Sequence, residues 1–443
     1  MTGLVASLGG FVSGLRTADI PPDVLEKARL ALVHNLSVAV AGNRLAEVAD
    51  QWSRRRWGGS GAHTLISGLE LAPPDAAFAN ACLIHARAQD DVYFPGLTHV
   101  GAATTPAVLA LAEAKAATLG DALTALVAGY EVAAAVSAVA APLTTSYGFR
   151  ASGIYGGFGA AAAAASLLRL DPTGSSHAIA IAGSFASGTN QTWVDGSLEW
   201  QLQLGAAARS GIEAASLAAS GGTGAAGALE GGAGFFAAFA RDAALAAPLS
   251  EAGLGEVWRT RDVTFKPYPV CAILQAPVAA ATELHERVGR PEFSRASIRL
   301  APAEAHYPGT DGTAPFDDAG AALMSASYCL TLGLVQGDVT ADDLFRSHEE
   351  ALQHLSRRLE VVADPTLAPR CFVLEVEYPD GHAERVERDG GSAFNWPREE
   401  LLMNVERLKR EVPAGIDLDR LAELAFGDLG TQVAEIVDTV IAS

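Results

Sequence analysis

Residues 85–101 read His-Ala-Arg-Ala-Gln-Asp-Asp-Val-Tyr-Phe-Pro-Gly-Leu-Thr-His-Val-Gly, and the interpretation of the whole chain starts from this stretch. The runs beside it, residues 75–88 and 102–118, are rich in alanine and leucine. Their apolar residues are too continuous for a helix with one exposed face, so we predict two buried helices joined by a polar loop. Polar groups carried so deep must be hydrogen-bonded, paired with a charge or used on a ligand. The loop is therefore a candidate functional site.

The stretch resembles the signature of the MmgE/PrpD family, where the segment reads H-A-L-D-F-D-D-T and, a few residues later, H-P-G. Here it reads H-A-R-A-Q-D-D-V and then T-H-V-G. The frame and the histidine, His99, are kept. Ala88, Val92 and Val100 stand where the family has aspartate, threonine and proline. The resemblance therefore implies a related site with altered chemistry.

Further segments match the family in the same order, so the resemblance extends over essentially the whole chain. They are Gly148-Phe-Arg-Ala-Ser-Gly153 for G-F-H-P-T-G, Leu202-Gln203-Leu-Gly205 with Ala207-Ala208, Lys266-Pro-Tyr-Pro-Val-Cys271 for K-P-Y-P-x-C, Tyr307-Pro-Gly309 and Tyr328-Cys329. The resemblance implies a helical domain, an α+β lid and a cofactor-free site between them. Pockets for ligands form preferentially at domain interfaces.

The pattern of the chain itself predicts a mainly α protein of two domains. A chain of 443 residues is too long for one ordinary core. From residue 75 to about 245, helical patterns follow one another, separated by glycine and proline. Beyond 262 we expect helices and strands at 272–288, 296–301, 319–334, 341–357, 371–378 and 382–388, the last two joined by Pro-Asp-Gly as a hairpin. We place a large all-helical domain at 1–261, to which 396–443 returns, and a smaller α+β lid domain at 262–395.

Composition limits the classes of partner. The net charge of −20 and the pI near 4.9 argue against nucleic acid and against an anionic membrane. An anionic substrate then needs a locally basic pocket. The four cysteines lack C-x-x-C spacing, and the N-terminus has no basic region followed by an apolar one, so we expect a cytoplasmic protein. The uncharged runs 132–149 and 151–168 are interrupted by Pro142 or rich in glycine and serine, which is typical of core helices.

Four residues are the candidates for catalysis. Lys266 follows a β-branched and aromatic stretch, where a lysine is costly to bury unless it is paired; it can bind a carboxylate or, with a lowered pKa, move a proton. His99 has a side chain suited to acid–base work near neutral pH. Tyr307 can place a phenol near a developing enolate or a leaving hydroxyl group. Asp91 forms an adjacent acidic pair with Asp90, whose two pKa values can separate.

Five residues are the candidates for substrate binding: Arg150, Ser152, Asp90, Trp200 and Gln203. Relative to the family, Trp200 replaces a lysine and Gln203 a histidine, while Arg150-Ala151-Ser152 replaces H-P-T. The exchange of charged groups for apolar ones implies a substrate with fewer carboxylates and more hydrocarbon. We expect His85 to pack on its own helix. No spacing typical of a metal site is present, so we predict neither a metal nor another cofactor.

The reactions of the family share proton transfer at a carbon beside a carboxylate or carbonyl group. The resemblance therefore implies a lyase or an isomerase with an enolate-like intermediate. We predict a cofactor-independent dehydratase of a hydroxy carboxylic acid, bulkier or less charged than methylcitrate and part of specialised metabolism. Two alternatives stay open: an epimerase of a small dicarboxylic acid, and a catalytically degenerate member that binds a ligand or serves as a scaffold. We also expect a homodimer.

Overall fold

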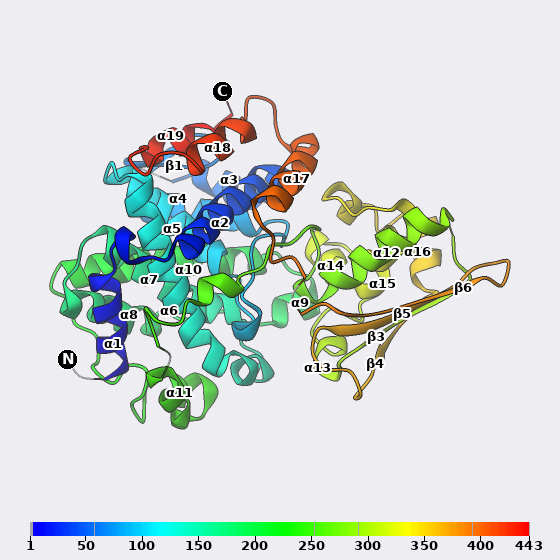
Figure 1. Ribbon diagram of the computed structural model, residues 1–443, viewed down its shortest axis with the longest axis horizontal. Helices are drawn as coiled ribbons and strands as arrows, with labels where there is room; N and C mark the ends of the chain where they lie inside the picture. The colour runs from blue at the N-terminus through cyan, green and yellow to red at the C-terminus, as the bar shows by residue number, and fades with distance from the viewer. Residues whose placement is uncertain (1–2, 57, 252, 291, 392, 443) are drawn as a thin grey trace.

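The computed structural model describes residues 3–442 except 57, 252, 291 and 392, and it contains an all-helical part and a smaller α+β part (Figure 1). The predicted fold class, mainly α with a smaller α+β unit, is confirmed. The C-terminal helices return to the all-helical part and lie beside α2. The domain boundaries at 262 and 395 remain a prediction.

The all-helical part contains most of the long helices. Their bounds are α1 (Leu4–Gly14), α2 (Pro22–Ala41), α3 (Glu47–Arg54), α4 (Pro73–His85), α5 (Val100–Ala114), α6 (Leu119–Ser146), α7 (Ala151–Leu167), α8 (Pro172–Ser184), α9 (Gln191–Asp195), α10 (Glu199–Ala219), α11 (Ala246–Ser250), α17 (Arg398–Leu408), α18 (Leu418–Ala425) and α19 (Val433–Asp438). This part is not helical throughout: a short antiparallel pair, β1 (Ala62–His63) and β2 (Glu70–Leu71), lies beside α4 and α5.

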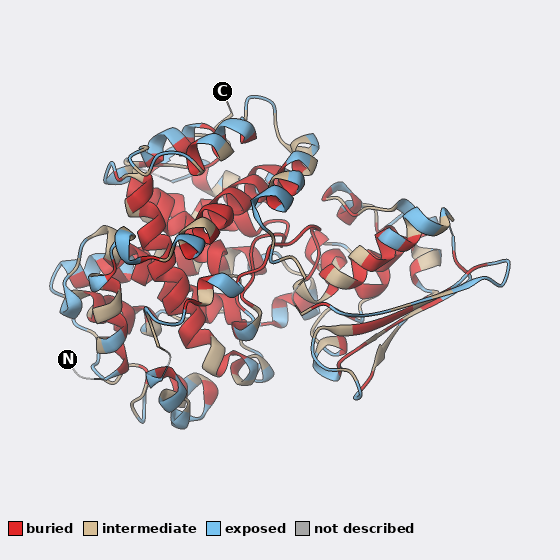
Figure 2. Ribbon diagram, in the orientation of Figure 1, coloured by how far each residue is buried: buried red, intermediate tan, exposed pale blue. Residues whose placement is uncertain are grey.

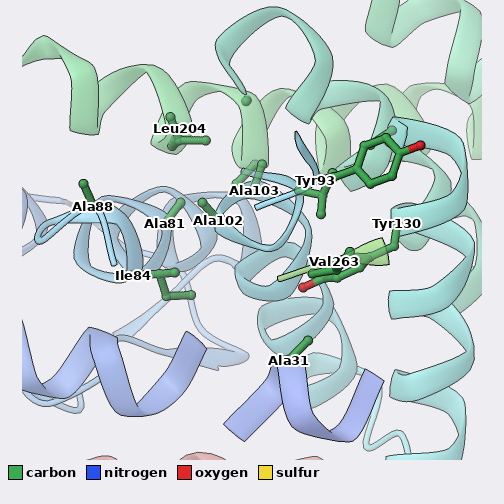
Figure 3. Close-up of a cluster of buried hydrophobic side chains, with 14 of the residues drawn as sticks. Ala31, Ala81, Ile84, Ala88, Tyr93, Ala102, Ala103, Tyr130, Leu204 and Val263 are labelled. Carbon is green, nitrogen blue, oxygen red and sulfur yellow. The ribbon is translucent and has the colours of Figure 1, made fainter. Parts of the chain in front are cut away.

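The core of this part is built from small residues on closely packed helices. Figure 2 shows that the central helices are buried on nearly all sides, and Figure 3 shows Ala81 of α4 and Ala102 and Ala103 of α5 near Leu204 of α10. A β-carbon at Gly129 of α6 would overlap Thr104 and the carbonyl oxygen of Gly159. Small residues at the contacts let helix axes approach closely. This packing explains the high alanine and glycine content of the chain.

Helix α6 is long and apolar enough by composition to cross a membrane, and it is the one such helix in the described part of the chain. In its most apolar window 89% of the residues are buried inside the protein. Its capping box, in which Thr118 Oγ1 accepts a hydrogen bond from the backbone N–H of Asp121, fixes where it begins. It is a core helix of the all-helical part.

The α+β part is one mixed sheet with helices packed against it. Its elements are α12 (Gln275–Val288), β3 (Arg295–Leu300), α13 (Pro302–Ala305), α14 (Ala319–Met324), α15 (Ala326–Gln336), α16 (Glu350–Ser356), β4 (Leu359–Ala363), β5 (Cys371–Glu377) and β6 (Ala383–Asp389). The strand order is β4-β3-β5-β6; β3 and β4 are parallel and the other pairs antiparallel. The helices α12 and α15 pack together against the sheet (Figure 1).

The two parts meet where the chain crosses between them. Thr264 pairs with Val92 of the polar loop through two backbone hydrogen bonds of 3.0 Å. Next to it, the N–H of Phe265 donates to the carbonyl oxygen of Phe394 on the returning crossing, at 2.9 Å. The polar loop is therefore fixed to the segment at Thr264, where the chain leaves the all-helical part. That segment is in turn fixed to Phe394, where the chain returns.

Some predicted elements differ from the structure. The helix expected at 319–334 is two helices, because Ser325 leaves the helical conformation and its Oγ accepts a hydrogen bond from the N–H of Tyr328 to cap α15. The helix expected at 341–357 is a short 3₁₀ turn, Asp342–Phe345, followed by α16. Strand β4 was not predicted. It pairs with β3, about sixty residues earlier in the chain, and no local turn marks it.

Candidate active site

The polar loop begins where α4 ends. The N–H of Ala88 donates to the carbonyl oxygen of His85 at 2.8 Å, and Ala88 adopts a left-handed backbone with φ of 47°. The turn directs the carbonyl oxygen of Ala88 to the amine of Lys266, which donates a hydrogen bond to it. Ala88, which stands where the family has an aspartate, thus contacts Lys266 through its backbone oxygen.

Asp91 is held in a structural cradle. Its Oδ1 accepts from the N–H of Gly101 at 2.8 Å, and its Oδ2 accepts from Asn35 Nδ2 at 3.0 Å and from the hydroxyl of Tyr130 at 2.5 Å. Burial raises the pKa of Asp91 to about 6, against these hydrogen bonds. A carboxylate with both oxygens occupied fixes the loop to α2, α5 and α6, so this geometry favours a structural role over the predicted catalytic one.

Asp90 points the other way and lies between two histidines. Its Oδ1 accepts from His85 Nδ1 at 2.7 Å, and its Oδ2 lies 2.9 Å from His99 Nδ1. The same nitrogen of His99 is 3.2 Å from the carbonyl oxygen of Asp91. Burial raises the pKa of Asp90, but electrostatic attraction to the two histidines and hydrogen bonds with them hold it well below its usual value. Asp90 is therefore ionised at the centre of the cluster.

His85, expected to pack on its helix, is part of the cluster. Its Nε2 is 2.5 Å from Arg150 Nη2. Because a guanidinium group only donates, Nε2 accepts and Nδ1 carries the proton given to Asp90. Burial lowers the pKa of His85 to about 3, in agreement with a neutral ring. The sequence signal for this role was the match of His85 to the first position of the family signature.

The tautomer of His99 follows in the same way. Its Nδ1 faces the oxygens of Asp90 and Asp91, so Nδ1 carries the proton and Nε2 is left free to accept one. No hydrogen bond reaches Nε2 from the described residues. Burial and the positive charge of Lys266 lower the pKa of His99, and Asp90 opposes them. The Oγ of Ser152 accepts from the N–H of His99 at 3.0 Å, so Ser152 positions its backbone.

Arg150 is buried with its donors engaged inside the protein. Nη1 donates to the carbonyl oxygen of Trp200 at 2.6 Å and to Gln203 Oε1 at 3.3 Å, while Nη2 donates to His85. Burial lowers the pKa of Arg150 to about 10, so it stays charged at neutral pH. These contacts support a positioning role for Arg150 and Gln203. Their predicted contact with substrate stays a prediction.

Aromatic side chains form one wall of the cluster. The ring of Trp200 lies 5.0 Å from the ring of His85 and 5.2 Å from that of Trp193. The indole N–H of Trp200 is buried and has no hydrogen-bond partner among the described residues. Burial raises the pKa of Tyr307 to about 12, and its phenol also interacts with Arg150 and Trp193. Tyr307 therefore keeps its proton and can donate a hydrogen bond. Nothing in the sequence pointed to Trp193.

Lys266 lies on the crossing between the two parts and is almost completely buried. Burial lowers its pKa, and the negative charge of Asp90 opposes that shift. A cavity of about 20 Å³ adjoins Lys266, with walls from both parts of the protein. That volume holds about one water molecule, so a substrate enters only when the parts move or side chains rearrange.

His85, Asp90 and His99 have ligand atoms within 4.8 Å of one another, close enough to hold a metal ion. The donor set does not fit a cation. Arg150 occupies Nε2 of His85, Nδ1 of His85 donates to Asp90, and Nδ1 of His99 faces Asp90 Oδ2 and the carbonyl oxygen of Asp91. The positive charges of Arg150 and Lys266 also act on His99. The geometry thus favours a proton-transfer cluster, and the absence of a metal stays a prediction.

The structure brings the predicted site residues into one region, with the exception of Asp91, whose side chain is in its own cradle. His99, Asp90, Arg150, Ser152, Trp200 and Gln203 are linked by direct contacts. Lys266 and Tyr307 interact electrostatically with Arg150.

Comparison with known proteins adds a family and named relatives. Residues 6–247 match the family model of the MmgE/PrpD N-terminal domain. A cis-aconitate decarboxylase of Aspergillus terreus is 26% identical over 475 aligned positions, which cover 99% of this chain and 96% of that protein. The chain is also 30% identical to cis-aconitate decarboxylases of A. terreus strain NIH 2624, over 65% of this chain, and of Homo sapiens, over 60%. These two matches span 61% and 56% of the relatives' own lengths.

Proposed function

The chain belongs to the MmgE/PrpD family, since the match covers more than half of it, and from this membership we propose that it is a lyase acting on a small carboxylic acid. Its curated relatives are named cis-aconitate decarboxylases, and decarboxylases are lyases. The observation that carries the proposal is the set of His99, Asp90 and Lys266 where the two parts of the protein meet; Asp90 and Lys266 are buried and His99 is partly buried.

Dehydration of a hydroxy acid is the reaction that this set supports best. A base removes a proton from the carbon beside a carboxylate, and an acid gives a proton to the leaving hydroxyl group. Nε2 of His99 is available as a base, and Asp90 lies at Nδ1 on the other side of the ring. Tyr307 keeps its proton and offers a donor, while Lys266 can carry or accept one. Paired acid and base groups in one buried site are what elimination of water requires.

Cations near the site support the enolate-like intermediate. Negative charge that develops on the substrate carboxylate is stabilised by donors already in place, and this effect is strongest where water is excluded. Lys266 is buried and bonded to a backbone oxygen, so it is oriented before substrate arrives. The chain's charge of −20 makes such a local cation necessary for an acidic ligand.

Decarboxylation is the second candidate, and the names of the relatives favour it. It needs one proton donor to carbon and a carboxylate placed in apolar surroundings, which the wall of Trp193 and Trp200 provides. It does not need a second acid–base group. The two reactions therefore make different demands on the same residues.

Product analysis in deuterated water separates the candidates. The purified chain is incubated, with a strong chelator present, with hydroxy acids and with cis-aconitate. Mass spectrometry and headspace analysis then follow water loss, carbon dioxide release and deuterium uptake. An unsaturated acid formed without carbon dioxide supports the dehydratase, and carbon dioxide with a deuterium-labelled product supports the decarboxylase. Label exchange alone indicates the epimerase, and no change with any acid indicates a binding or scaffold protein and contradicts the lyase proposal.

A further inference from the structure

A second cation lines the cavity beside Lys266. Arg370, just before β5 in the α+β part, lines the same small cavity as Lys266. The face of its guanidinium lies 3.8 Å from the centre of the Phe94 ring, which belongs to the polar loop of the all-helical part. Arg370 therefore spans the junction of the two parts, next to the site.

The charge of Arg370 is half-buried without a carboxylate in contact. Its Nη2 donates to the carbonyl oxygen of Gly390 at 3.0 Å, and among the described residues its guanidinium forms no ion pair with a carboxylate. Asp389 and Glu304 act on it only from longer range. A guanidinium carries five N–H donors in a planar fork that matches a carboxylate. The described residues accept one of these hydrogen bonds, from Nη2.

The backbone holds Arg370 firmly in this place. Its φ of 69° is in the left-handed region, which is unfavourable for an arginine. The N–H of Gly390 donates to the carbonyl oxygen of Arg370 at 2.9 Å, and Glu304 accepts from the N–H of Arg370 at 2.9 Å. A β-carbon at Gly390 would crowd Ala276, so the side of the cavity that carries Arg370 is closely packed. Residues in an uncommon backbone conformation, held there by hydrogen bonds to their own N–H and C=O groups, are often found where proteins contact ligands.

We propose that Arg370 binds a second anionic group of the substrate, remote from the reacting carbon that Lys266 and His99 serve. The inference rests on the proposed active site and deepens it. The substrate class is a chain with an acid group at each end, one for Lys266 and one for Arg370. Such a diacid agrees with a site that has lost family charges at 88 and 200 and gained aromatic area at Trp200.

Binding of simple diacids tests the proposal without any turnover. Calorimetry at constant ionic strength measures dissociation constants for malonate, succinate, glutarate and adipate, and for butyrate as a monoacid. The proteins are the wild type, Arg370→Gln and Arg370→Lys. Arg385→Gln is the matched control, because it removes one positive charge from an exposed ion pair on β6 of the same sheet.

We expect one or two diacid lengths to bind the wild type more tightly than butyrate does. Arg370→Gln should weaken that binding about 10-fold or more, the scale for loss of a charge-assisted hydrogen bond, and leave butyrate within about 2-fold. Arg370→Lys should recover part of the loss, and Arg385→Gln should match the wild type. Thermal melting of each variant shows whether it is folded.

Two results overturn the inference: no diacid binds the wild type better than butyrate, or folded Arg370→Gln binds the preferred diacid as the wild type does. Failure of the proposed function is distinct from either. Arg370-dependent diacid binding with no product from any acid leaves the binding site in place and removes the lyase. If an acid is turned over at the same rate by the wild type and by Arg370→Gln, the lyase proposal stands and the role of Arg370 is wrong.

Discussion

At the scale of single residues, the protonation states in the candidate site depend on neighbouring side chains. Asp90 holds a histidine at each carboxylate oxygen, and Arg150 completes the chain behind His85. His85 donates to Asp90 and accepts from Arg150, and His99 Nδ1 faces oxygens of Asp90 and Asp91, so the tautomers of both rings follow from these contacts. Nε2 of His99 accepts no hydrogen bond from the described part of the chain. In the proposed function, substrate lies beside that nitrogen and the buried amine of Lys266.

Replacement of Lys266 or His99 should remove activity without unfolding the chain. We expect Lys266→Ala and His99→Ala each to lower turnover about 100-fold or more, the usual contribution of an acid–base or charge-stabilising group. Lys266→Arg should not restore turnover if the lysine moves a proton, because arginine stays charged. Steady-state rates with the identified acid measure this. Near-wild-type turnover in both folded alanine variants would place the site elsewhere.

Gly101 is a residue whose lack of a side chain supports the site. A β-carbon there would overlap Asn35, Asp91 and Tyr130, the groups that form the cradle of the loop. We expect Gly101→Ala to destabilise the protein by about 2–3 kcal/mol through overpacking. Gly10→Ala is the control: nothing lies within 4 Å of its added carbon, and alanine favours the helix α1. Urea unfolding compares the two, and equal stability of both variants would contradict this account.

At the scale of elements, local patterns in the sequence predicted most of the fold. Continuous apolar runs located α4 and α5 to within a few residues, and alternation with a Pro-Asp-Gly turn located β5 and β6. Contacts between distant segments were not predictable in this way. His85 reaches Arg150, 65 residues away, and that pairing decides its role. Arg370 likewise could not be identified from the sequence, because its contact with Phe94 of the polar loop forms only in the folded chain.

A carboxylate near the C-terminus joins the two parts of the protein. Glu411 Oε1 accepts from the buried Arg87 at 3.1 Å, and its Oε2 accepts from the N–H of Ala341 in the α+β part at 3.1 Å. We expect Glu411→Gln to cost about 3 kcal/mol, because Arg87 would keep a buried charge without its partner. Asp342→Asn, which breaks an exposed pair with Arg44 across the same junction, should cost no more than about 1 kcal/mol.

Urea unfolding at neutral pH measures both costs. The comparison separates a buried link between the parts from a surface pair that contributes little. Equal effects of the two substitutions would show that Glu411 does not hold the parts together.

At the scale of the whole molecule, the homodimer stays a prediction. Family resemblance supports it, and the all-helical part is a plausible source of the interface. Light scattering in dilute solution should give about twice the chain mass of 45.6 kDa. A single mass near that of one chain would contradict it.

Buried histidines make the stability of the whole molecule depend on pH. Burial lowers the pKa of His34 to about 4 and that of His85 to about 3. Unfolded histidines bind protons below about pH 6.5, while the folded ones do not, so stability is lost as pH falls from 6.5. Each histidine contributes a slope of about 1.4 kcal/mol per pH unit. Asp91, with its pKa raised to about 6, opposes this loss between pH 6 and about 4.

His34→Gln isolates one of these terms. The ring Nε2 lies 2.8 Å from the carbonyl oxygen of Gln89, a contact that a glutamine amide can reproduce without titrating. Between pH 6 and 4.5 the unfolding free energy of this variant should fall less steeply than that of the wild type, by about 1.4 kcal/mol per pH unit. Denaturant titrations at several pH values give both slopes, and the comparison of slopes is unaffected by a constant loss of packing. Parallel curves would show that His34 binds protons equally in the folded and unfolded chain, and the pKa assigned to its burial would then be wrong.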